Sequence, residues 1–232
     1  MIPVMAWMAG IRDFLLPPCC PLCRQRHDGY CTLCRDLLPW IEHPCTVCGR
    51  GDTLSGVCGS CITSPPGFDR TIIPFHYREP VSGHIRRLKY NSQLHHARSL
   101  GMPLARCIRE KCTTVAHRPD MIVPVPLHWR KAFRRGYNQS AEIASIIAQY
   151  LDLPMHHSLL KRQKHTVSQT GLDQASRGKN MKHAFSANPD CHGLHIALVD
   201  DVVTSSSTIS DATRALKISG AAQVSVWAIA RS

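Results

Sequence analysis

The chain has 232 residues, enough for one full α/β domain with a sizeable core and a small appended unit. Lysine and arginine total 28 against 16 acidic residues, and the formal net charge of +12 favours polyanionic partners such as nucleic acid, an anionic membrane surface or a highly charged small ligand. Residues 1–16 lack the basic start of an export signal and are too few to span a bilayer, so we expect a cytoplasmic protein without a membrane span.

Residues 1–18 form an N-terminal segment ahead of the paired cysteines. Apolar residues recur on one side of 1–16, which predicts a short amphipathic helix. A role at a membrane surface would need a basic face, and this stretch has a single basic residue. We therefore expect the helix to pack against the rest of the protein.

Four CxxC pairs dominate the chemistry of the next stretch. In a reducing compartment cysteines serve as metal ligands, and two residues between thiolates let both reach one tetrahedral Zn²⁺. The simplest grouping gives two structural zinc sites of four cysteines each, but an interleaved pairing fits the same spacing, and Cys19 offers a one-residue shift. A redox role is disfavoured because no thioredoxin-like βαβ frame surrounds the pairs. The predicted metal ligands are Cys20, Cys23, Cys31, Cys34, Cys45, Cys48, Cys58 and Cys61.

A turn-rich linker, 63–67 (TSPPG), follows the cysteines and suggests a domain boundary. It divides the chain into an N-terminal segment at 1–18, a Cys-rich unit at 19–63 and a larger domain at 68–232. The Cys-rich unit has too few apolar residues for a core of its own, so we expect bound metal to supply its folding free energy.

The larger domain opens with one strand and two helices. The composition of 70–77 predicts a strand, and its internal proline places that strand at a sheet edge. The spacing of 84–90 (HIRRLKY) predicts a helix with Lys89 turned outward. A second helix is predicted within 94–112, starting or bending at Pro103.

A second buried strand is predicted at 120–126 (DMIVPVP), followed by a basic loop and an amphipathic helix that Ser140 could cap. Ligands in α/β proteins bind beyond the carboxyl ends of the strands, so this loop lies where an anionic ligand is expected. A solvated loop without a ligand is the plainer alternative. The loop's basic residues are Arg130, Lys131, Arg134 and Arg135.

The stretch 159–185 is polar, basic and punctuated by glycine, with no convincing strand before its end. A loop of this length inside a compact domain is usually a functional lid, although a disordered excursion has the same composition. The cations that could clamp an anionic ligand as the lid closes are Lys161, Arg162, Lys164, Arg177 and Lys179.

The stretch 195–208 (HIALVDDVVTSSST) combines the features of a phosphate site. A short apolar strand ends in two adjacent carboxylates, Asp200 and Asp201, and a loop of hydroxyl residues leads into a helix over 207–220. Hydroxyl groups, backbone amides and a helix N-terminus bind phosphate, while carboxylates accept hydrogen bonds from sugar hydroxyls. The loop residues are Thr204, Ser205, Ser206, Ser207 and Thr208.

A last core strand is predicted at 224–229, so strands and helices alternate through the domain. This alternation predicts an α/β fold with a parallel sheet. At 195–208 the sequence resembles a type I phosphoribosyltransferase, whose acidic pair and Thr-Thr-Gly-Ser/Ala-Thr loop bind phosphoribosyl pyrophosphate (PRPP) with Mg²⁺. Ser206 stands where that family has glycine, so the resemblance leaves open whether the site is catalytic or only binds the ligand.

Taken together, the motifs resemble the competence protein F (ComF) family over nearly the whole chain. The matching stretches are CPLC/CTLC, CTVC/CGSC, HIRRLKY, VPVPLHWRKAFRRGYNQS, TVSQTGL…RGKNMKHAF and LVDDVVT. The resemblance implies a double zinc ribbon followed by a phosphoribosyltransferase-like domain. It also implies a role in natural transformation, in which the protein handles incoming single-stranded DNA at the cytoplasmic side of the membrane.

Two other functions fit the same residues. One is a working phosphoribosyltransferase, with Asp200 and Asp201 holding the ribose, the 204–208 loop holding the 5′-phosphate, and Arg134, Arg135 and Arg177 contacting pyrophosphate. The other is a zinc-ribbon scaffold with a degenerate ligand site that recruits other DNA-uptake proteins. The acceptor of a transferase reaction has no signature in the sequence.

Overall fold

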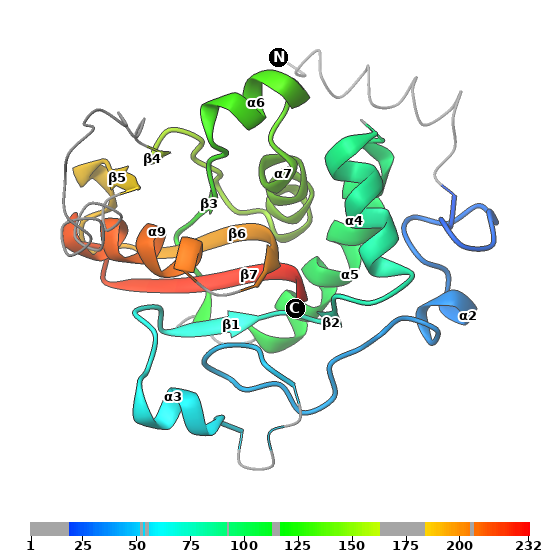
Figure 1. Ribbon diagram of the computed structural model, residues 1–232, viewed down its shortest axis with the longest axis horizontal. Coiled ribbons are helices and arrows are strands. Elements are labelled where there is room, and N and C mark those ends of the chain that lie inside the picture. Colours follow the sequence, from blue (N-terminus) through cyan, green and yellow to red (C-terminus); the bar gives the residue numbers. More distant parts are fainter. Residues whose placement is uncertain are drawn as a thin grey trace, which may run out of the picture.

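The computed structural model describes residues 19–51, 53, 56–91, 93–112, 117–162, 184–204 and 207–232. Its centre is a five-stranded, all-parallel sheet in the order β1-β7-β6-β3, with β2 also paired to β7 (Figure 1). The parallel α/β fold predicted from the sequence is confirmed. The strands are β1 (Arg70–Ile72), β2 (Phe75–His76), β3 (Met121–Pro124), β6 (His195–Val203) and β7 (Gln223–Arg231).

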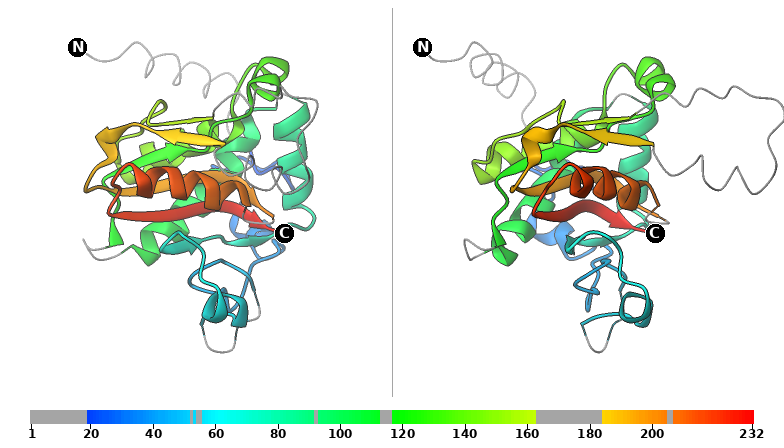
Figure 2. Two further views of the ribbon diagram at one scale, coloured as in Figure 1. Left: turned by 60° about the vertical axis from the view of Figure 1, so that its left-hand side comes forward. Right: turned by 90° about the vertical axis from the view of Figure 1, so that its left-hand side faces the viewer.

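Helices cover both faces of this sheet (Figure 2). Along β6, Ala197 and Val199 join the apolar cluster of one face, whereas Ile196 and Leu198 join that of the other. This alternation follows from the two-residue period of a strand, and it explains why the run is apolar throughout. The first face carries α4 (Val81–Tyr90), α5 (His95–Lys111) and α7 (Gln139–Leu151). The second face carries α9 (Ser207–Ile218) and the antiparallel pair β4 (Leu160–Arg162) and β5 (Phe185–Ala187).

Several elements differ from the expectations. The edge strand over 70–77 is split into β1 and β2 at Pro74, whose ring removes a donor from the ladder. Helix α5 begins at His95 and continues through Pro103, so that proline does not start the helix. The start of 159–185 forms β4, which pairs with β5, although no strand was expected there. Residues 163–183 of the predicted lid, with three of its five cations, and the N-terminal helix within 1–18 lie outside the described residues. The other two lid cations, Lys161 and Arg162, lie on β4.

The basic loop expected after β3 is instead a short helix, α6 (Trp129–Arg135). The His128 ring accepts a hydrogen bond from the Arg130 amide at its start, and Gly136, at φ 75°, ends it in the left-handed conformation. Helix α7 is capped by Asn138, whose side chain accepts from the Ser140 amide at 3.1 Å. The expectation that Ser140 caps α7 is therefore wrong. The Ser140 hydroxyl donates a hydrogen bond to Asp200 instead.

The Cys-rich part includes α2 (Thr32–Arg35) and α3 (Gly59–Thr63), which lie apart in Figure 1. Its first half shares the main apolar core, because Cys20 and Tyr30 cluster with residues of α4 and α5. Its second half forms a small separate cluster. Among the described helices, none has the length and apolarity that a membrane crossing requires.

Candidate functional site

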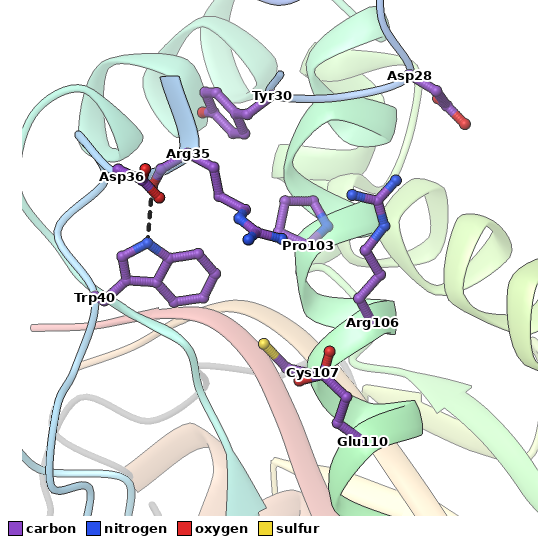
Figure 3. A pocket seen from close by; sticks show the side chains of 9 residues that line it. All are labelled: Asp28, Tyr30, Arg35, Asp36, Trp40, Pro103, Arg106, Cys107 and Glu110. Carbon is purple, nitrogen blue, oxygen red and sulfur yellow. Dashed lines mark hydrogen bonds between the residues drawn. The ribbon is translucent and has the colours of Figure 1, made fainter. Parts of the chain in front are cut away.

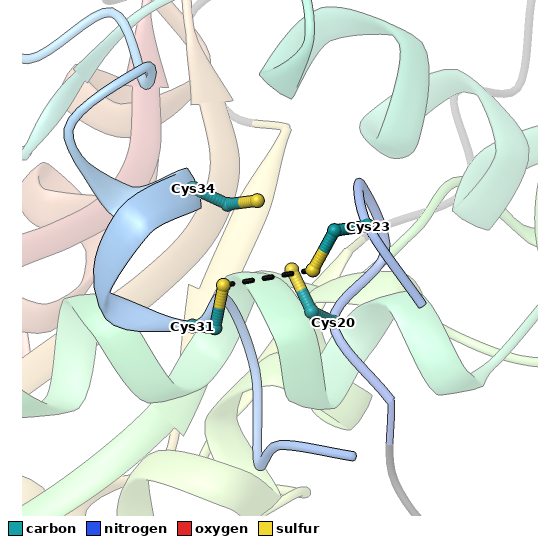
Figure 4. A group of neighbouring side chains, drawn as sticks. All are labelled: Cys20, Cys23, Cys31 and Cys34. Carbon is teal, nitrogen blue, oxygen red and sulfur yellow. Dashed lines mark hydrogen bonds between the residues drawn. The ribbon is translucent and has the colours of Figure 1, made fainter. Parts of the chain in front are cut away.

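The eight predicted metal ligands converge into two groups of four thiols. The groups are Cys20, Cys23, Cys31 and Cys34, and Cys45, Cys48, Cys58 and Cys61, with all sulfur atoms of a group within 4.8 Å of one another. In the first group the thiol of Cys31, just before α2, and that of Cys34, within α2, face the two thiols of the preceding loop (Figure 4). The structure therefore groups the cysteines in sequence order and excludes the interleaved pairing.

These thiols fit a tetrahedral zinc ion. Zn–S bonds of about 2.3 Å place sulfur atoms about 3.8 Å apart, whereas a disulfide brings them to about 2.05 Å. The sulfurs of Cys23 and Cys31 lie 3.6 Å apart, as do those of Cys48 and Cys58. Burial raises the pKa of the Cys20 thiol, but amide hydrogen bonds outweigh burial and lower this pKa to about 6. Cys19 is exposed and outside the group, so the one-residue shift is excluded.

The two carboxylates lie within β6 rather than after it. The strand continues to Val203, because its ladder with β7 persists beyond the acidic pair. The Asp200 carboxylate accepts hydrogen bonds from the Ser140 hydroxyl at 2.9 Å and from the Asp201 amide at 2.8 Å. Asp201 is only 4% exposed. The start of α7 therefore meets the carboxyl-terminal half of β6, and Ser140 is a site residue that the sequence analysis missed.

Lys89 of α4 completes this cluster. Its ammonium group lies 2.8 Å from the Asp201 carboxylate, and its side chain is 19% exposed. The expectation that Lys89 points outward is therefore wrong. Its spacing of four residues from Ile85 already placed both on one helix face, and that face is buried. A buried carboxylate such as Asp201 also needs a neighbouring cation, which is the second signal that could have found Lys89.

The two arginines of α6 that were expected to contact pyrophosphate, Arg134 and Arg135, lie in different surroundings. The Arg135 guanidinium donates to the Gln139 side chain at 2.7 Å and stacks 5.1 Å from the centre of the Tyr90 ring. Tyr90 follows Lys89, so these contacts bring Arg135 to the neighbourhood of the acidic pair. Arg134 is exposed on α6.

The hydroxyl loop is described only at its ends. Thr204 follows β6, and Ser207 and Thr208 form the exposed first turn of α9. The guanidinium of Arg231, on β7, donates to the carbonyls of Val203 at 2.7 Å and of Thr204. These bonds fix the point at which the loop leaves the strand. Ser205, Ser206 and Arg177 lie outside the described residues, so their predicted roles are untested.

The surroundings of the acidic pair favour the protonated form of Asp200 below about pH 7. Burial, followed by the charge of Asp201, raises the pKa of Asp200 from 3.8 to about 7, against the opposing effects of the Asp201 amide, Ser140 and Lys89. A carboxyl with a pKa near neutrality can exchange its proton at physiological pH.

We expect Asp200 to make folding less favourable as the pH rises from about 4 to about 7. The folded protein holds a proton on Asp200 across this window, which the unfolded chain has lost, so the free energy of unfolding falls with rising pH. His84 and His96 act oppositely, because burial lowers their pKa values to about 4 and about 3. Urea unfolding gives the free energy of unfolding of wild type and of Asp200→Asn at each pH. The difference between the two removes the contribution of the histidines, because both proteins have them. The free energy of unfolding of the variant should rise relative to that of wild type up to about pH 7 and should then keep a constant difference. If the two curves of unfolding free energy against pH run parallel from pH 4 to pH 7, the assignment is contradicted.

Replacing Lys89 with methionine is expected to lower the free energy of unfolding by roughly 1–3 kcal/mol at pH 8, because it leaves the Asp201 charge buried without its cation. Asp201→Asn should also destabilise the protein. The double variant should be more stable than the sum of the two single effects predicts, since it has no unpaired charge. Additive losses in this double-mutant cycle would show that the two side chains do not interact.

A cavity of about 300 Å³ lies away from the acidic pair, between the segment 28–40 and α5. Arg35 and Arg106 approach it from α2 and α5, and Trp40 lies at its wall (Figure 3). Asp36 and Glu110 also line it, so the lining has no clear preference for an anion.

The fold and the acidic pair define a domain of the phosphoribosyltransferase type, and the family model of the phosphoribosyl transferase domain matches residues 137–231. The chain is 34% identical to competence protein F of Haemophilus influenzae, over 88% of this chain and 91% of that protein. It therefore belongs to the ComF family. Identity to the DNA utilization protein YhgH of Escherichia coli K12 is 33%, over 94% of this chain and 98% of that protein. Among solved structures, the glutamine PRPP amidotransferase of Bacillus subtilis has a TM-score of 0.40 and 19% identity, over 56% of this chain and 26% of that chain.

Proposed function

We propose that the protein acts in natural transformation by handling incoming single-stranded DNA at the cytoplasmic side of the membrane, and that its β6 site binds PRPP or a related sugar phosphate. The observation that carries the ligand proposal is the placement of Asp200 and Asp201 on β6, directly before a hydroxyl loop and the first turn of α9. The relatives named for competence and DNA utilization support the cellular role.

Each part of the ligand has its own partners in this proposal. The two carboxylates accept hydrogen bonds from the ribose hydroxyls, and Lys89 holds the Asp201 carboxylate in place. The loop 204–208 binds the 5′-phosphate through backbone amides and hydroxyls, aided by the N-terminal end of α9. Arg135, with Arg177, contacts the pyrophosphate, which Mg²⁺ would bridge, whereas Arg134 is exposed on α6. Zinc in the two cysteine groups would be structural, because four thiolates leave no open coordination position.

Calorimetric titration with PRPP and Mg²⁺ tests the ligand proposal. We expect saturable binding of one PRPP per chain that weakens when Mg²⁺ is omitted. A mobility-shift series with single-stranded DNA tests the cellular role, and we expect affinity to fall steeply as salt rises because the chain carries a net charge of +12. Absence of heat in the first experiment, or salt-independent or absent binding in the second, would contradict the corresponding proposal.

A catalytically active phosphoribosyltransferase of nucleotide metabolism is the second candidate. It is favoured by the pKa of Asp200, about 7, which suits a group that gains or loses a proton during a reaction. Release of pyrophosphate from PRPP in the presence of a panel of bases and amines would support it. If the protein binds PRPP but releases no pyrophosphate with any acceptor, the site has a binding role only. A scaffold with a degenerate site that recruits other DNA-uptake proteins would instead give no heat in the calorimetric titration with PRPP and Mg²⁺.

A further inference from the structure

The outer side of α6 combines exposed aromatic rings with cations. We call Trp129, Arg130, Phe133 and Arg134 the α6 face. Phe133 is 89% exposed and Trp129 is 50% exposed, and both are large apolar side chains that a folded chain usually buries. The Arg130 guanidinium lies 5.3 Å from the centre of the Trp129 ring. The exposed rings and the cations beside them together make this side of α6 a candidate binding surface.

The order of these residues arranges them into two parallel rows. Trp129 and Phe133 are four residues apart on a helix, as are Arg130 and Arg134, so each pair lies on one side of α6. The aromatic row therefore runs beside a cationic row. The sequence of α6, WRKAFRR, contains no acidic residue that would offset these charges.

We infer that the α6 face is a docking surface for single-stranded DNA, with bases stacked on Trp129 and Phe133 and phosphates paired with Arg130 and Arg134. The inference deepens the proposed handling of single-stranded DNA by assigning it a surface, and it rests on that proposal. Aromatic rings stack with any base, and arginines follow the phosphates, so the surface accepts strands of any sequence.

The geometry selects a single strand over a duplex. Side chains four residues apart on a helix lie about 5–6 Å from each other, which is wider than the roughly 3.4 Å between successive nucleotides of a B-DNA strand. Consecutive bases can reach both rings only when they are unstacked and extended. A duplex offers its phosphates but keeps its base faces inside the stack.

The α6 face adjoins the sugar-phosphate site. Arg135, the last residue of α6, contacts Gln139 and the exposed ring of Tyr90. Gln139 precedes Ser140, which donates to Asp200, and Tyr90 follows Lys89, which pairs with Asp201. A strand on the α6 face would therefore lie close to the acidic pair.

Fluorescence anisotropy with a labelled oligo-dT and its duplex counterpart, over a salt series, tests this assignment. Replacing Trp129 and Phe133 with alanine should weaken single-strand binding at least about thirtyfold. The matched control is Leu33→Ala with Leu37→Ala, which removes an apolar pair of the same spacing that is 77% and 71% exposed elsewhere. This control should bind like wild type.

The arginines have a separate readout. Replacing Arg130 and Arg134 with glutamine should lower the slope of log affinity against log salt by about 1.4, since each single-strand phosphate contact contributes about 0.7. Replacing the exposed Arg26 and Arg78 with glutamine removes the same charge from other surfaces and should lower the slope less. Trp129→Phe should keep the affinity but lose the quenching of tryptophan fluorescence by the strand.

The outcomes separate this inference from the function on which it rests. If wild type binds the strand and the Trp129/Phe133 variant binds equally well, the α6 face is not the docking surface, although the proposed function stands. Equal binding of duplex and single strand would overturn the stacking mode. If wild type binds no single-stranded DNA, both the inference and that part of the proposed function are wrong.

Discussion

Replacing Cys20 with serine is expected to remove one of two zinc ions and to cost the protein much of its stability. Cys20 is fully buried within the main apolar core, beside residues of α4 and α5. Structural zinc sites contribute on the order of 10 kcal/mol of binding free energy, which is comparable to the whole stability of a domain. Native mass spectrometry should give two zinc ions for wild type and one for the variant, with a large drop in the unfolding temperature.

Cys19→Ser is the matched control for this prediction. It changes the neighbouring thiol, which is exposed and lies outside the group of four. This variant should keep two zinc ions and the unfolding temperature of wild type. Loss of zinc from Cys19→Ser but not from Cys20→Ser would reverse the assignment. Two zinc ions in both variants would show that the first group does not depend on Cys20.

Replacing both Asp200 and Asp201 with asparagine is expected to abolish measurable PRPP binding. Hydrogen bonds to a charged group contribute about 1.5–3 kcal/mol each, so at pH 8, above the Asp200 pKa of about 7, losing both acceptors should weaken PRPP binding by roughly 10²–10⁴-fold. The Asp200→Asn single variant separates this effect from misfolding. It keeps a side-chain oxygen for Ser140 and removes a carboxylate whose ionised form is disfavoured by burial. It should therefore be at least as stable as wild type above pH 7 while binding PRPP more weakly.

Asp211→Asn is the control for the loss of a carboxylate. Asp211 lies on α9 close to the loop, but its carboxylate pairs with Arg214 on the same helix. PRPP binding, measured by equilibrium dialysis, should be unchanged in this variant. Equal affinities for wild type and for the variant that lacks both β6 carboxylates would show that the pentose is bound elsewhere.

The parts of the fold that were predictable from the sequence depend on local patterns. The β-branched run before Asp200 predicted a buried parallel strand because both faces of that strand are covered. The CxxC spacing predicted the metal ligands because a tight turn alone brings two thiols together. The order of the cysteines left the pairing open, and the distances between the thiols decide it.

The missed features depend on contacts between distant segments. Lys89 and Ser140 reach the acidic pair only because the end of α4 and the start of α7 both come to the carboxyl-terminal half of β6, and no pattern within either helix specifies where those two ends meet. The helix α6 was missed because four cations in seven residues suggested a solvated loop, whereas caps at both ends stabilise it as a helix. Strand β4 is three residues long, and its partner β5 lies more than twenty residues further along the chain.

A crystal structure of the protein with PRPP and Mg²⁺ is the most direct test of the central claim that the acidic pair binds a phosphorylated pentose. We expect the ribose hydroxyls within about 3.2 Å of the Asp200 and Asp201 carboxylates, and the 5′-phosphate against the amides of the loop 204–208. A pentose bound away from β6, or side chains filling the space beyond the two carboxylates, would contradict the claim.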